Sequence, residues 1–432
     1  MSAPGNGAAP GQLNPYVRDL QCVLCGQSWP ATLTAGTCPA CGPQGILEVR
    51  FDYRALGRDW DRDRLGVQDG RRAGLGAGMW QFWPFLPVGP QASDSPLVPG
   101  GTPLVDAPRL ARAVGVGRLW LKDEGRNPTA SLKDRASAVG VAMARLAGAR
   151  VVATASTGNA ASSLAGAAAA CGLKSVIFVP QTAAEAKIAQ LLIFGAVVLV
   201  VEGTYADAFR LACQAIEEYG WYSRLSGLNP YLVEGKKTAG LELARDLGWR
   251  APDWVVVSVG DGCTVAGVAK AFEELAELGW IEGRPRVLGV QAQGAPAVAE
   301  FFRTGSFRPG PEATIADGIA VGEPRNYLKA ARRVRASGGT FVEVSDDEIR
   351  EAMRLTGRLA GVFAEPAAAA AVAGLVRAAR EGIVGRGDEV AVLITGSGLK
   401  DVRRAVEAGG SPIRVAAEAQ AVRAALPAEV RE

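Results

Sequence analysis

The sequence contains no histidine among its 432 residues. This absence excludes a Ser-His-Asp triad, a Cys-His pair, histidine-ligated metals and imidazole acid–base catalysis. A general base in this protein must therefore be Lys, Asp, Glu, Tyr or Cys. A lysine in an unusual position becomes a stronger candidate for catalysis as a result.

Long hydrophobic runs and a marked charge imbalance are also missing. The longest apolar runs, 165–171 and 367–373, are short and made of small residues, so we expect no membrane span. The net charge is only +3 and no basic stripe with interleaved aromatics occurs, so we expect no nucleic-acid partner. The N-terminus lacks a basic region followed by an apolar core, so we expect no secretory signal and a cytoplasmic protein.

Cysteine is scarce, and the cysteines that occur are grouped. Four of the seven cysteines form a Cys-x₂-Cys-x₁₂-Cys-x₂-Cys pattern: Cys22, Cys25, Cys38 and Cys41. Four thiolates at this spacing predict a tetrahedral zinc ribbon, and a site closed by four protein ligands is structural. Four unligated buried cysteines are the alternative. The other three are scattered, which indicates a reducing compartment without a disulfide framework.

The length allows two or three domains. We expect five segments: a disordered tail at 1–17, a zinc ribbon at 18–50, a linker or arm at 51–100, a catalytic domain at 101–410 and a C-terminal helical tail at 411–432. The arm contains several Trp, Phe and Pro residues, which favour either aromatic anchors on the catalytic domain or a plain packed loop.

From Leu104 onward, apolar strands alternate with helical patterns. We expect strands at 119–122, 150–154, 175–180, 196–201, 254–259, 287–290 and 389–394, with helices between them. Near-continuous apolar strands alternating with helices indicate parallel sheets covered on both faces. Roughly 300 residues of this pattern exceed one ordinary sheet, so we expect an α/β fold of two interleaved lobes with ligands at the carboxyl ends of the strands.

Lys133 lies in an unusual place for a lysine. Asn127-Pro128 signals a turn, and a helical pattern begins soon after it. Lys133 is therefore expected at a helix N-terminus, where the helix dipole disfavours an ammonium. A lysine there gains if it is neutralised, for example as an imine. A surface lysine is the alternative for this residue taken alone.

Three polar loops follow predicted strands. The first carries Ser156, Thr157, Gly158 and Asn159 and suits a carboxylate or phosphate, although an ordinary N-cap is the alternative. The second comprises Gly260, Asp261, Gly262, Cys263 and Thr264 and predicts a nest for a cofactor phosphate. The third starts at Thr395, which offers a neutral hydroxyl or a helix cap. A reactive lysine, a phosphate nest and a neutral hydroxyl together describe a pyridoxal phosphate site.

The motifs resemble those of one enzyme family in the same order. Residues 127–135, Asn-Pro-Thr-Ala-Ser-Leu-Lys-Asp-Arg, resemble the Asn-Pro-Thr-Gly-Ser-Phe-Lys-Asp-Arg box of threonine synthases. Further matching segments lie at 100–104, 155–159, 229–230, 234–238, 365–366 and 395–401. The resemblance covers about residues 80–410. It implies the fold-type II fold of pyridoxal phosphate enzymes, which is tryptophan synthase beta-like, and a homodimer.

The resemblance also implies residue roles. Lys133 would form the imine with pyridoxal phosphate, Asn159 would contact its phenolic oxygen, and residues 260–264 would hold its phosphate. Thr395 would face the ring nitrogen, and a hydroxyl there suits elimination over transamination. Residues 156–158 would bind the carboxylate of a small amino-acid substrate.

The sequence departs from the family in two places. Asp261, Cys263 and Thr264 replace the asparagines and second glycine of the usual phosphate loop. Leu232 stands where the family often has an arginine, which removes a bidentate anion clamp. Lys122 is then the candidate contact for a substrate phosphate.

The implied activity is conversion of O-phospho-L-homoserine and water to L-threonine and phosphate. Two alternatives remain at this stage. One is a β-elimination or β-replacement enzyme, of the threonine or serine ammonia-lyase or cysteate synthase type. The other is a catalytically inactive relative whose zinc ribbon binds a protein.

Overall fold

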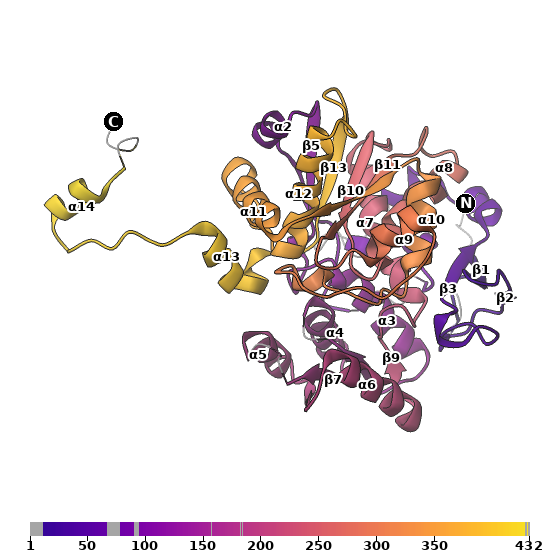
Figure 1. Cartoon of the computed structure of the whole chain (residues 1–432). Helices are drawn as coiled ribbons and strands as arrows, with labels where there is room; N and C mark the ends of the chain where they lie inside the picture. Colours follow the sequence, from indigo (N-terminus) through magenta and orange to yellow (C-terminus); the bar gives the residue numbers. More distant parts are fainter. Residues whose placement is uncertain are drawn as a thin grey trace.

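The structure is a computed structural model of the chain, and it describes residues 12–66, 78–89, 95–156, 158–181, 183, 185–427 and 430. A small N-terminal ribbon packs beside a body of two α/β lobes, and the C-terminal segment extends away from that body (Figure 1). The two-lobed α/β fold predicted from the alternating pattern is confirmed.

The N-terminal ribbon is an antiparallel sheet in the order β2-β1-β3, formed by β1 (Val17–Cys22), β2 (Ser28–Trp29) and β3 (Leu47–Phe51). A short 3-10 helix, η1 (Gly42–Gln44), precedes β3. The expected disordered tail at 1–17 is wrong for its last residues. Asn14 is buried and donates hydrogen bonds to the carbonyls of Trp83 and Leu86, both at 2.8 Å. The first eleven residues lie outside the described part of the chain.

The arm joins the ribbon to the body through three short helices, α1 (Tyr53–Asp59), η2 (Arg64–Gly66) and η3 (Gly78–Phe85). Met79, Trp80 and Phe82 of η3 are buried. The arm is therefore anchored by aromatic and apolar side chains where it is described. Residues 67–77 and 90–94 lie outside the description.

The large lobe contains a six-stranded sheet in the order β12-β11-β10-β13-β5-β4. Its strands are β4 (Leu104–Asp106), β5 (Arg118–Asp123), β10 (Trp254–Ser258), β11 (Arg286–Ala292), β12 (Thr340–Val344) and β13 (Glu389–Ile394). All neighbouring pairs are parallel except β4 with β5.

Helices cover both faces of this sheet: α2 (Pro108–Val114), α7 (Tyr231–Asp246), α8 (Cys263–Glu277), α9 (Ala297–Thr304), α10 (Tyr327–Ala336), α11 (Asp346–Ala360) and α12 (Pro366–Arg380). Alternate residues of β10 point to opposite faces. Val255 and Val257 belong to the core with α7 and α8, whereas Val256 belongs to the core with α11 and α12. The short helices η5 (Glu124–Arg126) and η6 (Asp317–Ile319) lie in the connections.

The small lobe contains a parallel sheet in the order β8-β7-β6-β9. Its strands are β6 (Val151–Ala155), β7 (Lys174–Pro180), β8 (Val197–Val201) and β9 (Tyr222–Ser223). Its helices are α3 (Lys133–Leu146), α4 (Asn159–Ala170), α5 (Glu185–Ile193) and α6 (Tyr205–Tyr219). Because the chain enters this lobe after β5 and returns at α7, the lobes are interleaved in sequence.

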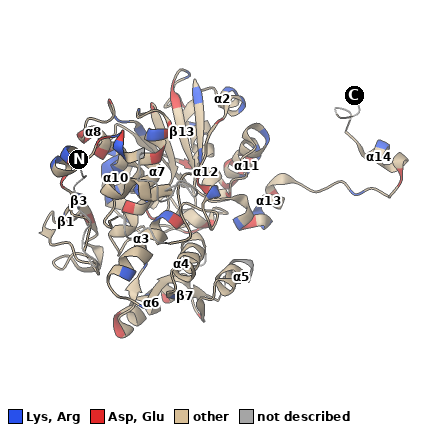
Figure 2. Cartoon of the chain, turned by 180° about the vertical axis from the view of Figure 1, so that it is seen from behind, with Lys and Arg blue, Asp and Glu red and all other residues tan. Residues whose placement is uncertain are grey.

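The C-terminal part begins with η7 (Gly398–Asp401) and α13 (Val402–Gly409) and ends with α14 (Ala419–Ala425), which lies apart from the body (Figure 1). Of the helical tail expected at 411–432, only α14 is an α-helix among the residues described. Positive and negative residues are interspersed over the helices (Figure 2). No helix in the described ranges is long and apolar enough to cross a membrane.

Candidate active site

Lys133 is the first residue of α3, as the turn signal predicts. The preceding segment is tied to the loop that follows β13. The Leu132 amide donates to the carbonyl of Thr395 at 2.9 Å, and the Ser397 amide donates to the carbonyl of Ala130 at 3.0 Å. Two loops that are more than 250 residues apart in sequence are therefore joined at the lysine. Ala130 has a φ of 64°, a left-handed conformation that costs a non-glycine residue about 1–2 kcal/mol.

A buried ion cluster holds the start of α3 in place. Arg135 is fully buried, and its guanidinium donates to Glu124 at 2.6 and 2.7 Å and to Glu242 at 2.8 and 2.9 Å. Glu124 lies in η5 and Glu242 in α7. The helix that presents Lys133 is thus fixed to both flanking elements of the body.

The amine of Lys133 is less basic than an ordinary lysine. Burial, followed by the positive charges of Lys236 and Arg224, lowers its pKa to about 8. An ordinary lysine has a pKa of about 10.4, so Lys133 has a much larger neutral, nucleophilic fraction near neutral pH.

This shift predicts a pH dependence for cofactor uptake. The rate at which the apoenzyme recombines with pyridoxal phosphate should rise with pH and level off above about pH 8, because the neutral amine attacks the aldehyde. Stopped-flow absorbance between about pH 6 and 10 would measure it. A midpoint near the value of a free lysine would contradict the burial of this amine.

The loop after β10 forms a tight cradle at the start of α8. A Cβ on Gly260 would lie 2.9 Å from the Ile319 Cα, and one on Gly262, whose φ is +90°, would lie 2.8 Å from the Asn326 carbonyl oxygen. No side chain caps α8, so the helix presents its first backbone N–H groups to an anion. Lys236 of α7 is also buried, and its charge acts on both Lys133 and Cys263.

The unusual residues of this loop have structural partners. The Asp261 carboxylate accepts hydrogen bonds from the Arg325 amide at 2.7 Å and from Asn326 at 3.1 Å. The buried Cys263 thiol donates to Asp261 at 3.0 Å. Asp261 is therefore engaged with the segment before α10, and the backbone amides of the loop remain the groups suited to a phosphate.

The loop after β6 leads into α4, which starts at Asn159 without a side-chain cap. The Gly158 amide donates to the Ser156 hydroxyl at 3.2 Å, whereas Thr157 lies outside the described residues. The Asn159 amide nitrogen donates to both oxygens of Glu365 at 2.8 and 3.1 Å.

Glu365 is a site residue for which the sequence analysis gave no role. It is the N-cap residue of α12, and its amide donates to the Gly396 carbonyl at 3.0 Å. Its charge also acts on Lys133. The Glu365-Pro366 pair at the start of an alanine-rich run was the only sequence signal for it.

The assignment of Lys122 to a substrate phosphate is corrected by the structure. Lys122 is fully buried in β5, and its ammonium lies 2.8 Å from Asp246, 3.0 Å from Glu242 and 2.7 Å from the Thr102 carbonyl. These partners use the three N–H donors of the ammonium. Lys122 therefore belongs to the buried ion cluster around Arg135.

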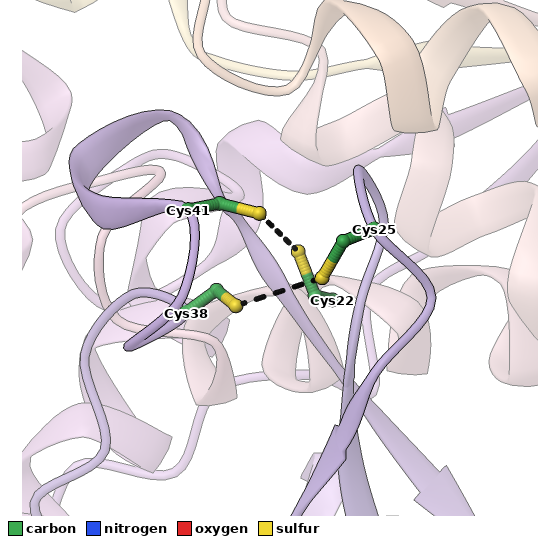
Figure 3. Close-up of side chains that lie close together, drawn as sticks. All are labelled: Cys22, Cys25, Cys38 and Cys41. Atoms are coloured by element: carbon green, nitrogen blue, oxygen red, sulfur yellow. Dashed lines mark hydrogen bonds between the residues drawn. The ribbon is translucent and has the colours of Figure 1, made fainter.

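The four paired cysteines lie together at the tip of the N-terminal ribbon (Figure 3). The sulfur atoms of Cys25 and Cys38 are 3.8 Å apart and those of Cys22 and Cys41 are 4.0 Å apart, with all four within 4.8 Å. A metal–sulfur bond of about 2.3 Å gives a tetrahedron with an edge of about 3.8 Å. The geometry suits a metal ion bound by four thiolates.

The site around Lys133 fits pyridoxal phosphate. A glycine cradle at a helix N-terminus suits the phosphate, and a poorly basic lysine suits the aldehyde. The loop from Thr395 closes over the same segment, and all three loops stand at the carboxyl ends of parallel strands, where ligands bind in such folds.

Comparison with known proteins agrees with this geometry. Residues 96–396 match the family described as "Pyridoxal-phosphate dependent enzyme". The chain is 36% identical to the threonine synthase of Methanocaldococcus jannaschii, over 91% of this chain and 96% of that protein. It is 35% identical to the threonine synthase of Methanosarcina acetivorans, over 94% and 98%.

Solved structures show the same fold. A bacterial-type threonine deaminase, from the organism abbreviated T.th., superposes with a TM-score of 0.60 at 28% identity, covering 68% of this chain and 92% of that one. The tomato (Solanum lycopersicum) threonine deaminase isoform 2 superposes with a TM-score of 0.61 over 71% and 86%, and at 24% identity it supports the fold alone. The chain therefore belongs to the fold-type II pyridoxal-phosphate-dependent enzymes and, within them, to the threonine synthase family.

Proposed function

We propose that this protein converts O-phospho-L-homoserine and water to L-threonine and inorganic phosphate, with pyridoxal phosphate as its cofactor. The observation that carries the proposal is the poorly basic Lys133 at the start of α3, between the glycine cradle and the loop from Thr395. The likeness to threonine synthases along nearly the whole chain supports the choice of substrate.

Each loop has a proposed task. The backbone of residues 260–264 holds the cofactor phosphate, with Lys236 as the nearby buried cation. Asn159 contacts the phenolic oxygen and is oriented by Glu365. Residues 156–158 hold the substrate carboxylate at the uncapped start of α4.

Lys133 performs the proton transfers. The bound cofactor supplies an electron sink at the substrate Cα. The Lys133 amine, once the substrate amine has replaced it, takes the proton from Cα and moves protons at Cβ and Cγ as phosphate leaves. Its pKa of about 8 suits both accepting and donating protons near neutral pH.

A paired assay tests this function. We expect purified enzyme to release phosphate from O-phosphohomoserine and to form threonine in equal amount, with ketoacid production from serine or threonine much slower. Rapid ketoacid release without phosphate turnover would assign the enzyme to the ammonia-lyases, and no turnover of any of these substrates would favour an inactive relative.

The loop residue Thr395 sets the protonation of the cofactor ring in this proposal. Thr395→Asp should place a negative charge beside the ring nitrogen and favour its protonation. We expect slower elimination and more transamination product, measured as pyruvate-type and ketoacid by-products by mass spectrometry. Thr395→Ser retains the hydroxyl and should keep most activity. Unchanged turnover and product ratio in Thr395→Asp would remove Thr395 from this role.

The cysteine cluster is proposed to bind one structural zinc ion. Cys22→Ser combined with Cys38→Ser should lose about one zinc per chain by metal analysis. We expect damage to the ribbon but retained cofactor, because a four-thiolate site has no open coordination position. Cys171→Ser with Cys213→Ser is the matched control, since these residues lie away from the cluster. Full zinc content in the cluster variant would refute the site.

The protein is further proposed to be a cytoplasmic homodimer. Val402 and Val406 of α13 are 53% and 58% exposed, and Ile413 beyond them is 62% exposed. These apolar residues lie on the segment that extends from the body (Figure 1). A second copy of the chain would cover them, and sedimentation velocity of the full chain would measure the assembly.

A further inference from the structure

Arg224 is a buried cation next to the active site to which the proposed function so far gives no role. It directly follows β9, and its amide donates to the Ala153 carbonyl of β6 at 2.8 Å. Only 1% of the residue is exposed. The side chain is therefore enclosed between the sheet of the small lobe and α3.

The guanidinium of Arg224 has only neutral partners. Its Nε donates to the Ser137 hydroxyl at 3.1 Å and its Nη1 to the Ser226 hydroxyl at 3.0 Å. Its Nη2 is buried and has no acceptor within the described part of the chain. Arg135, by contrast, is equally buried but is paired with two glutamates. An enclosed guanidinium without a carboxylate partner is costly, so a charge that arrives with a ligand would offset a real penalty.

The position of Arg224 relative to Lys133 follows from α3. Ser137 lies four residues after Lys133 and therefore on the same face of the helix, one turn away. The two cations also act on each other electrostatically, since Arg224 contributes to the lowered pKa of Lys133. Nη2 of Arg224 thus lies within the part of the site that surrounds the reacting amine.

Arg224 lies beside the residue that departs from the family pattern. A Cβ added to Gly140 of α3 would lie 3.0 Å from Cδ2 of Leu232 and 3.8 Å from Cγ of Arg224. The two side chains therefore meet the same point of α3, one from α7 and one from the end of β9. A cation at 224 can serve the space that a cation at 232 would otherwise serve.

We infer that Arg224 binds the phosphate of the substrate, in place of an arginine at position 232. This inference rests on the proposed function. A planar guanidinium matches phosphate oxygens in a bidentate geometry, and Nη2 is free to make the first contact. Ser137 and Ser226 hold the guanidinium through Nε and Nη1, and the surrounding side chains move apart to admit the phosphate.

The test compares a phosphorylated ligand with an unphosphorylated one. In Arg224→Leu, we expect the KM for O-phosphohomoserine to rise by about 100-fold, in line with loss of a charge-assisted bidentate contact. The dissociation constant of the unreactive phosphonate 2-amino-5-phosphonopentanoate, measured by cofactor absorbance, should rise similarly. The slow turnover of L-serine should change by less than about twofold, because serine carries no phosphate. Arg210→Leu on the exposed face of α6 is the matched control and should match wild type throughout.

A second variant guards against simple misfolding. Arg224→Leu combined with Leu232→Arg returns a guanidinium to the same space from α7 and should recover at least about a tenth of the lost affinity for the phosphonate. Arg224→Lys keeps the charge without the planar fork and should fall between wild type and Arg224→Leu.

Two results would overturn the inference. One is unchanged phosphonate affinity in Arg224→Leu, and the other is an equal loss with serine that Leu232→Arg does not reverse, which indicates a structural role. If wild type itself does not turn over O-phosphohomoserine, the proposed function fails. Competition by inorganic phosphate in wild type and in Arg224→Leu then still decides whether Arg224 binds an anion.

Discussion

Lys133→Ala should lose turnover by about 10⁴-fold and release its cofactor on dialysis, which is the largest effect we expect from any single substitution. The reason is that Lys133 is the amine at the start of α3, where the three loops converge, and burial keeps it poorly basic. No other group in the described site can replace both its covalent link and its proton transfers.

The measurement combines activity with the mass of the protein after borohydride reduction. Wild type should gain the mass of one reduced pyridoxal phosphate, and Lys133→Ala should gain none. Lys174→Ala, at the exposed start of β7, is the control and should match wild type. A borohydride-fixed cofactor in Lys133→Ala would remove this lysine from the mechanism.

Arg135→Leu should lower the free energy of unfolding by about 3–5 kcal/mol, the cost of leaving buried carboxylates without their cation. Glu124 and Glu242 would lose a fully enclosed partner that contacts them at 2.6–2.9 Å. Burial alone would raise the pKa of Glu242, but the charge and hydrogen bonds of Arg135 hold this pKa below its ordinary value.

The sign of the pH dependence follows from that shift. A depressed carboxyl pKa contributes stability above the unfolded pKa of about 4.3, and the contribution is lost as pH falls through the folded value. The difference in stability between wild type and Arg135→Leu should therefore shrink in acid. Urea unfolding at neutral and acidic pH would show this.

Arg118→Leu is the control for the cluster. Its ion pair with Asp106 is about half exposed, at 51% and 46%, and should contribute less than about 1 kcal/mol. Equal losses in the two variants would mean that enclosure of the Arg135 cluster has no special weight.

The parts of the site that were predictable from sequence are those coded within one short segment. Lys133 follows a turn signal and opens a helix, and each polar loop follows an apolar strand directly. The covered parallel sheets follow from the same local pattern. A strand such as β12 (Thr340–Val344) was not named in advance, because Thr, Glu and the flanking glycines weaken its apolar signal.

Contacts between distant segments account for what the sequence did not provide. Lys122 has the charge to bind a phosphate, and only the approach of α7 reveals its pairing with Asp246 and Glu242. Glu365 meets Asn159 across 206 positions. Arg224 reads as an ordinary residue after a short strand until its burial and its lack of a carboxylate partner are seen.

The central claim is that phosphate leaves by cleavage of a carbon–oxygen bond and that water is added at Cβ. Turnover of O-phosphohomoserine in ¹⁸O-labelled water tests it most directly, with both products analysed by mass spectrometry. We predict one ¹⁸O atom in the threonine hydroxyl and none in the released phosphate. Label in the phosphate, with homoserine as the other product, would show simple phosphoester hydrolysis and contradict the claim.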